Sequence, residues 1–353
     1  MAKTRYIFSS RPQRHPVRTF FRTLLILLIS AVLLVGMANF IVTHSVQLVR
    51  QSVTIQNLPE GLENFTIMVI SDLNGETLGS HQKSILNAIG TTAVSCIVFT
   101  GDVCGPGGDV SAFLELVAGL PEDTSKYLVP GDMDPDLTVS TAHGSLSVLN
   151  DWAQQVQEAG VTILEEPVIE TRNKCSLYLV PASLYSLDLA AMESAYQARL
   201  DEMNAQPSLT ADESAMKRLC EYQLEKTQRI RETAAAMTED DVQIAITHVP
   251  FTSEQILAEQ QNGATGILSL NNASLVIAGH YCGGQWRIPG IGALYVEELG
   301  WYPADSEVQG LSYHRGLWQY ISPGLTASLS SPLPGRLFCQ PTVTILALTS
   351  RIT

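Results

Sequence analysis

The chain of 353 residues carries 21 Lys and Arg against 35 Asp and Glu, which gives a net charge of −14. Every acidic residue lies beyond residue 59, whereas seven of the basic residues lie within the first fifty, so the remainder of the chain is strongly acidic. Such a surface repels phosphate backbones, which argues against nucleic acid as a partner. Any anionic substrate therefore needs a local positive charge, such as a metal ion, at its binding site.

The N-terminal part is predicted to be a membrane anchor. Residues 23–43 form an apolar stretch, and the uncharged run Thr23 to Val42 is long enough for a helix to cross a bilayer core of roughly 30 Å. Residues 1–22 are basic and contain no acid, which by the positive-inside rule keeps this tail in the cytoplasm. A cleavable signal peptide is the competing interpretation, but the apolar stretch is longer than the usual 7–15 residues and no A-x-A site follows. We expect a single-pass protein of the plasma membrane with residues 51–353 on its outer face.

Residues 51–353 show the alternation of strands and helices that is typical of an α/β domain. Apolar runs at Phe65–Ile70, Val94–Thr100 and Tyr127–Val129 predict strands, and each is followed within three residues by an aspartate. The six cysteines are scattered without a C-x-x-C pair, so they do not indicate a disulfide framework. Ligands of a mainly parallel sheet bind at the carboxyl ends of its strands, where these acids lie.

Residues 187–240 differ in composition from the rest of the domain. They are rich in Ala, Glu, Met, Arg and Gln, and contain one proline and no glycine. This composition predicts two helices, Leu189 to Asn204 and Ala211 to Met237, with Thr210 near the start of the second. We interpret the segment as a helical hairpin inserted into the domain.

Side chains that can bind a metal follow the predicted strands. A single aspartate in such a position is usually a helix cap or a turn residue. A whole set at one edge of a sheet is instead a concentrated oxygen and nitrogen donor set, which suits Mn, Zn or Fe and leaves charge unrelieved without a cation. The set consists of Asp72, Asn74, Asp102, Asp132, Asp134, His248, His280 and Cys282.

The order of these residues resembles that of the calcineurin-like metallophosphoesterases. The motifs of that family run D-x-H, G-D, G-N-H-D/E, a lone His after a strand, and G-H-x-H, and the counterparts here are SDLNG, TGDVC, PGDMDP, ITHVP and AGHYCGGQ. Segments such as NLPEGLENFTIMVISDL and GRLFCQPTVTILAL resemble the membrane-associated branch that acts on lipid-linked or nucleotide-sugar phosphates. The resemblance implies an α/β (α+β) fold, a four-layer αββα sandwich interrupted by the helical hairpin.

The resemblance also implies two metal positions, and this chain differs from the family in some of their ligands. One position would be held by Asp102, Asp132, His248 and His280, with Asp132 where the family has Asn. This half of the site keeps four competent ligands.

The other metal position would be formed by Asp72, by Asp102 as the bridging ligand, and by Asn74 and Cys282 where the family has histidines. An amide oxygen is a poorer ligand than an imidazole nitrogen, and a thiolate favours Zn²⁺. We therefore expect one or two divalent ions and a partly degraded site.

The activity implied by the resemblance is hydrolysis of a phosphoester or pyrophosphate bond by a metal-activated water. Met133 stands where the family has a histidine that helps to protonate the leaving group, and loss of such a general acid costs about 10²–10⁴ in rate. Asp134 matches the acidic residue that orients that histidine. Two interpretations stay open: an active hydrolase of a membrane-proximal phosphate substrate, and an inactive binding or regulatory protein of the same fold.

Overall fold

The computed structural model describes residues 16–139, 147–262 and 266–351. The chain divides into two compact units, Met1–Val42 and Thr43–Thr353, which are treated separately. Most of the predicted cytoplasmic tail, residues 1–15, lies outside the described residues.

The first unit contains the helix α1 (Pro16–His44), which runs two residues into the second unit. Among the described residues, the span Val17–His44 is the one helix long and apolar enough to cross a membrane, with a mean hydropathy of 2.7. This helix contains the apolar stretch that the sequence predicts as a transmembrane segment.

Two six-stranded sheets form the centre of the second unit. The first sheet has the strand order β1 (Gln47–Thr54), β16 (Thr342–Thr349), β2 (Thr66–Ile70), β3 (Cys96–Phe99), β4 (Ser125–Leu128), β5 (Thr162–Ile163). The second has the order β14 (Gly310–His314), β15 (Leu317–Ile321), β9 (Ala273–Ala278), β8 (Val242–Ile246), β7 (Cys175–Pro181), β6 (Val168–Arg172). Strands β2 to β5 are mutually parallel, as are β7, β8, β9 and β15.

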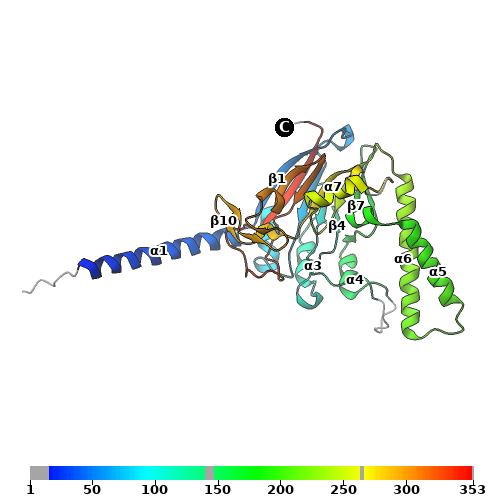
Figure 1. Cartoon of the computed structure of the whole chain (residues 1–353), viewed down its shortest axis with the longest axis horizontal. Coiled ribbons are helices and arrows are strands. Elements are labelled where there is room, and N and C mark those ends of the chain that lie inside the picture. Colours follow the sequence, from blue (N-terminus) through cyan, green and yellow to red (C-terminus); the bar gives the residue numbers. More distant parts are fainter. Residues whose placement is uncertain (1–15, 140–146, 263–265, 352–353) are drawn as a thin grey trace, which may run out of the picture. The chain divides into compact units, whose positions relative to one another are not determined.

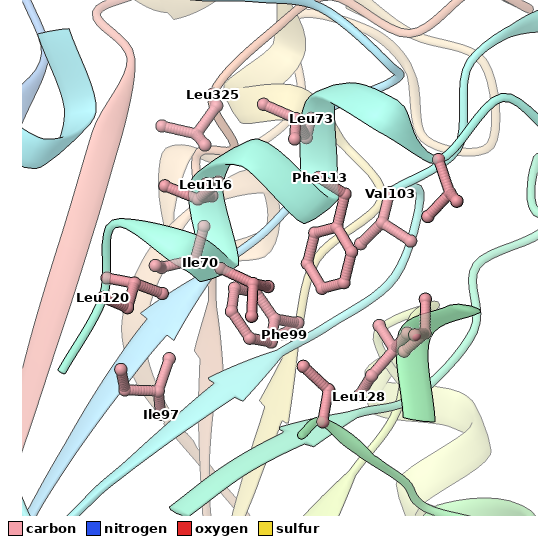
Figure 2. Packing of buried hydrophobic residues seen from close by; sticks show 14 of the residues in the cluster. Ile70, Leu73, Ile97, Phe99, Val103, Phe113, Leu116, Leu120, Leu128 and Leu325 are labelled. Atoms are coloured by element: carbon pink, nitrogen blue, oxygen red, sulfur yellow. The ribbon is translucent and has the colours of Figure 1, made fainter. Parts of the chain in front are cut away.

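Three buried clusters show how the layers pack. Along β2, Ile67 and Val69 belong to the core between the two sheets, whereas Met68 and Ile70 face helices, because successive strand residues point to opposite faces. Figure 2 shows Phe113 and Leu116 of one such helix close to Ile70, Ile97 and Phe99 of the first sheet. The helices of this layer are α2 (Lys83–Ile89), α3 (Ser111–Ala118) and α4 (Asp151–Glu158).

The outer face of the second sheet is covered in the same way. Val180 and Val276 of this sheet share a buried cluster with Ile230 and Ile256, which come from α6 (Ala211–Ala236) and α7 (Ser253–Asn262). Helices therefore flank both sheets, and the predicted four-layer αββα order is confirmed.

The segment 187–240 forms two long helices, α5 (Leu189–Asn204) and α6, which lie side by side in Figure 1. Asp188 caps α5 by accepting from the Ala191 N–H, and Thr210 and Glu213 form a reciprocal capping box at the start of α6. These bounds agree with the sequence to within one residue. A small cluster that includes Leu200, Met203 and Cys220 joins the two helices.

Several elements differ from those expected. Helices α3 and α7 were not predicted, and β1 is eight residues long because it pairs along its whole length with β16. The segment after β9 is irregular. It holds the short strands β10 (Arg287–Ile288), β11 (Gly292–Ala293), β12 (Tyr295–Val296) and β13 (Gly300–Trp301) and the helix α8 (Asp305–Val308).

Single-turn helices complete the element order. They are η1 (Glu60–Leu62), η2 (Ser80–Gln82), η3 (Pro106–Gly108), η4 (Ala182–Ser186), η5 (Leu270–Asn272) and η6 (Cys282–Gly284). All six cysteines are free, and only Cys175 is not fully buried.

Candidate metal centre

Five of the predicted ligands meet at one edge of the sandwich. They follow the carboxyl ends of β2, β3 and β4 in the first sheet and of β8 and β9 in the second. Their ligand atoms form two groups, and the atoms of each group lie within 4.8 Å of one another. One group is Asp132, His248 and His280, and the other is Asp72, Asp102 and His248.

His248 belongs to both groups and lies at their centre. Its Nε2 is 2.7 Å from Asp132 Oδ1 and 3.4 Å from Asp102 Oδ2. The Nδ1 of His280 lies 3.2 Å from Asp132 Oδ1 and 3.2 Å from His248 Nε2. Asp102, the expected bridge, belongs to only one of the two groups, and its Oδ1 accepts the Met133 N–H at 3.0 Å.

Each imidazole is also hydrogen-bonded through its second ring nitrogen, on the side away from the site. The Nδ1 of His248 is 2.6 Å from the Thr100 carbonyl oxygen, and the Nε2 of His280 is 2.8 Å from Glu298 Oε1. If a cation takes the place of the proton on the other nitrogen, the nitrogen in each of these contacts would keep its own proton and donate it. Metal-binding histidines in proteins have this arrangement, in which the second nitrogen donates to a carbonyl or a carboxylate.

Carboxylates dominate the charge of the centre. Burial alone lowers the pKa of His248, but its hydrogen bonds to Asp102 and Asp132 outweigh that effect and raise the pKa to about 11. His280 behaves alike: burial lowers its pKa, and hydrogen bonds to Asp132 and Glu298 raise it to about 9. The same contacts hold the pKa of Asp132 well below its usual range. The carboxylates therefore favour positive charge at this site, and positive charge is what a divalent cation would bring.

The backbone of the site is held in an uncommon conformation. Non-glycine residues rarely adopt positive φ, and doing so costs about 1 kcal/mol or more each. Residues of this kind cluster at functional sites when the surrounding structure fixes them. Here they include Asp72 (φ 56°), Asn74 (φ 50°), Asp102 (φ 55°), His280 (φ 75°) and Cys282 (φ 48°).

Gly131 allows the loop after β4 to approach the loop after β3. A Cβ atom at this position would collide with the carboxylate and the backbone nitrogen of Asp102. The glycine of PGDMDP is therefore needed for Asp132 to lie beside Asp102.

Asp72 and Asn74 lie deep in the second half of the site. Asp72 is fully buried, which raises its pKa, and it accepts from the His280 N–H at 3.1 Å and from the Ser71 hydroxyl at 2.5 Å. Asn74 donates through Nδ2 to Thr326 Oγ1 at 3.1 Å, but its buried Oδ1 has no hydrogen-bond partner among the described residues. A buried amide oxygen without a donor is a position that a cation can satisfy.

Cys282 belongs to neither ligand group. Its side chain is fully buried, and burial raises the pKa of the thiol well above its ordinary value. Its carbonyl oxygen accepts from Cys339 Sγ at 3.4 Å. Only a nearby cation would convert this thiol to the thiolate that binds metals.

Met133 and Asp134 follow Asp132 on the same loop. Met133 is half-buried, and its backbone N–H donates to Asp102. Its thioether side chain has no proton to donate. The Asp134 carboxylate accepts from the backbone N–H groups of Val103 (2.9 Å), Cys104 (2.8 Å) and Gly131 (2.8 Å). Asp134 thus ties the β3 loop to the β4 loop.

Glu298 was not identified from the sequence. It lies between the short strands β12 and β13, and its contact with His280 depends on the folding of that irregular segment. The one signal in the sequence is the acidic pair Glu297-Glu298 shortly after the GHYC motif, which is too common to be specific.

Comparison with known proteins agrees with this geometry. The profile described as calcineurin-like phosphoesterase matches residues 65–283, which is more than half of the chain and includes every predicted ligand from Asp72 to Cys282. The chain therefore belongs to the calcineurin-like phosphoesterase family, whose members generally use divalent metals. The predicted family is confirmed.

No curated protein sequence matches the chain. Among solved structures it is similar to the phosphopantetheinyl hydrolase (PptH) from Mycobacterium tuberculosis, with 15% identity, 74% of this chain and 89% of that chain covered, and a TM-score of 0.35. This similarity assigns no substrate to the present chain.

Proposed function

We propose that this protein is a metal-dependent phosphoesterase anchored in the plasma membrane by α1, with its folded domain on the outer face. The observation that carries the proposal is the convergence of Asp72, Asp102, Asp132, His248 and His280. Two oxygen and nitrogen donor groups that share one buried imidazole suit a pair of divalent ions.

The chain's own residues would divide the work as follows. Asp132, His248 and His280 hold one cation, and Asp72, Asp102 and Asn74 hold a second, with Cys282 as a further donor if Zn²⁺ binds. Cations in these positions supply Lewis acidity and an activated water for attack on phosphorus. Thr100 and Glu298 keep the imidazoles in the required tautomers.

A membrane-associated substrate is supported by the apolar helix α1, which precedes the domain in the chain. We propose a lipid-linked or nucleotide-sugar phosphate as the substrate.

The test is hydrolysis of bis(4-nitrophenyl) phosphate by the purified full chain with Mn²⁺, Zn²⁺ or Fe²⁺ added after chelation. We expect turnover that depends on the cation and is abolished by His280→Ala. The variant His81→Ala is the matched control, because His81 is exposed and bonds to Glu115 away from the site. Absence of turnover with every cation would refute the proposal.

A second candidate is a non-catalytic binding or regulatory protein that retains the fold. Met133 favours it, since a thioether cannot protonate a leaving group. This candidate predicts metal binding without turnover, whereas the hydrolase predicts both.

A further inference from the structure

A cavity of about 480 Å³ opens beside the metal centre. Asp132 and His248 form one end, and the base of the α5–α6 hairpin and the turn η4 form the far wall. This size lies within the range of small-molecule sites. A molecule with its phosphate at His248 therefore has room for a substituent under the hairpin.

The lining of the cavity is mainly apolar, and it includes Leu137, Leu164, Leu184, Leu187, Leu189, Met192, Ile230 and Val249. Two polar groups of the wall are already bonded, since Lys226 Nζ donates to Glu165 Oε1 at 2.6 Å and Thr227 Oγ1 donates to the Gln223 carbonyl at 2.7 Å. Gln223 and Ser183 also line the cavity, so a ligand would meet a mostly apolar surface with a few polar groups.

Ionic contacts hold α6, which we call the roof of the cavity, against the rest of the domain. Glu165 accepts from both Lys226 and Tyr222 of α6, and the neighbouring Glu166 pairs with Arg229 at 2.9 Å. Consecutive residues of one loop therefore contact consecutive turns of α6, and the mostly buried Lys226–Glu165 pair holds this helix beside the cavity.

A nucleotide does not match this lining. Bases are bound by stacking on aromatic rings, and additional phosphates need unpaired cations. The lining residues include no Phe, Tyr or Trp, the imidazole of His248 belongs to the metal centre, and the single lysine is already paired with Glu165. The chemistry of the wall therefore favours a hydrocarbon substituent over a nucleoside.

We propose that the cavity binds the alkyl chain of an amphiphilic phosphate ester, whose phosphate lies at Asp132 and His248. This inference rests on the proposed function for the position of the phosphate, and it selects the lipid-like substrate class over the nucleotide sugar. The apolar part of the substrate leaves the membrane and is buried between η4, α5 and α6.

The test measures the affinity of n-alkylphosphonates, from methyl to hexyl, for the metal-loaded full chain in lipid nanodiscs by calorimetry. Phosphonates are not hydrolysed, so binding is read without turnover, and empty nanodiscs correct for partition into lipid. We expect Kd to fall about threefold to fourfold for each added CH₂ until the cavity is filled.

Two variants locate the binding to the cavity. Met192→Glu and Leu187→Glu place a carboxylate in the wall, at half-buried and exposed positions that tolerate it, and should remove most of the gain with chain length. Ala198→Glu adds the same charge to an exposed position of α5 outside the cavity and should retain the gain.

The outcomes separate this inference from the proposed function. A Kd that is independent of chain length, tighter binding of uridine monophosphate than of hexylphosphonate, or equal effects of Met192→Glu and Ala198→Glu would overturn the inference. Turnover of bis(4-nitrophenyl) phosphate with no chain-length effect would retain the enzyme and refute the cavity. A chain-length effect without turnover under any cation would retain the cavity as a binding site and refute the proposed enzyme.

Discussion

Met133 lies between two residues whose contacts are defined, since Asp132 meets both imidazoles and Asp134 accepts three backbone N–H groups. Its backbone is thus fixed while its half-buried side chain makes no polar contribution. The family carries a histidine at this position. A substitution at Met133 can therefore add a proton-donating side chain with little change to the backbone of the loop.

Met133→His is expected to raise kcat for an aryl phosphodiester by about 10²–10⁴, because it restores a general acid beside the metal centre. Met133→Leu, which has similar volume and no proton to donate, should leave kcat unchanged. Steady-state kinetics with equal metal content in all three proteins measures this. An unchanged kcat in Met133→His would show that proton donation here does not limit the reaction.

Asp134→Ala is expected to lower the free energy of unfolding by about 3 kcal/mol, because it leaves three loop N–H groups without their carboxylate acceptor. Asp134→Asn keeps one acceptor oxygen and should cost less. Thermal unfolding of the full chain should show the melting temperature falling in that order. Asp136→Ala is the control, since the hydrogen bonds of Asp136 use its carbonyl oxygen; an equal loss there would contradict the role of Asp134.

The site residues that directly follow a strand could be predicted from the sequence, whereas those placed by an irregular segment could not. Asp72, Asp102, Asp132, His248 and His280 each follow an apolar strand, and the packing of the two sheets brings the strand ends together. Glu298 could not be predicted, because only the fold of an irregular segment brings it to His280. The contacts of Asp134 were also hidden, since its hydrogen-bond donors are backbone N–H groups that the sequence does not distinguish.

At the scale of elements, the α5–α6 hairpin depends on contacts at its base. The Lys226–Glu165 pair is mostly buried, with side-chain exposures of 13% and 16%, whereas the neighbouring Arg229–Glu166 pair is exposed at 48% and 36%. Ion pairs at exposed positions contribute little, and breaking a buried pair leaves an uncompensated charge. The two pairs form a matched comparison on one helix.

A double-mutant cycle with Glu165→Gln and Lys226→Met should give a coupling energy of about 1–3 kcal/mol in the free energy of unfolding. The cycle with Glu166→Gln and Arg229→Met should give less than about 1 kcal/mol. Hydrogen exchange of α6 amides should rise in Glu165→Gln and not in Glu166→Gln. Equal coupling in both cycles would mean that the buried pair does not fix the roof of the cavity.

The elements themselves were predictable where local signals are strong. Helices α5 and α6 were located within a residue because Asp188 and the Thr210–Glu213 capping box fix their starts. Helix α3 was missed because the glycine-rich segment before it predicts a turn and its own apolar run resembles a buried strand. The short ladders β10 to β13 depend on tertiary packing and carry no regular periodicity.

At the scale of the whole molecule, the proposal places the tail inside the cell and the domain outside. In a Cys175→Ser background, a cysteine at exposed Glu239 should react with a membrane-impermeant maleimide in intact cells. A cysteine at Lys3 should react only after permeabilisation. The opposite labelling pattern would place the domain in the cytoplasm and contradict the proposed topology.

The central claim is that the strand-end residues bind a divalent metal. The most direct measurement is the amount of Mn, Zn and Fe that the full chain retains after equilibration and gel filtration, determined by elemental analysis. We predict at least one ion per chain, with about tenfold or greater loss of affinity in His248→Ala and none in His314→Ala, since His314 bonds to Ser253 and Ser312 outside the site. No bound metal in the unmodified protein, or equal metal in His248→Ala, would contradict the account.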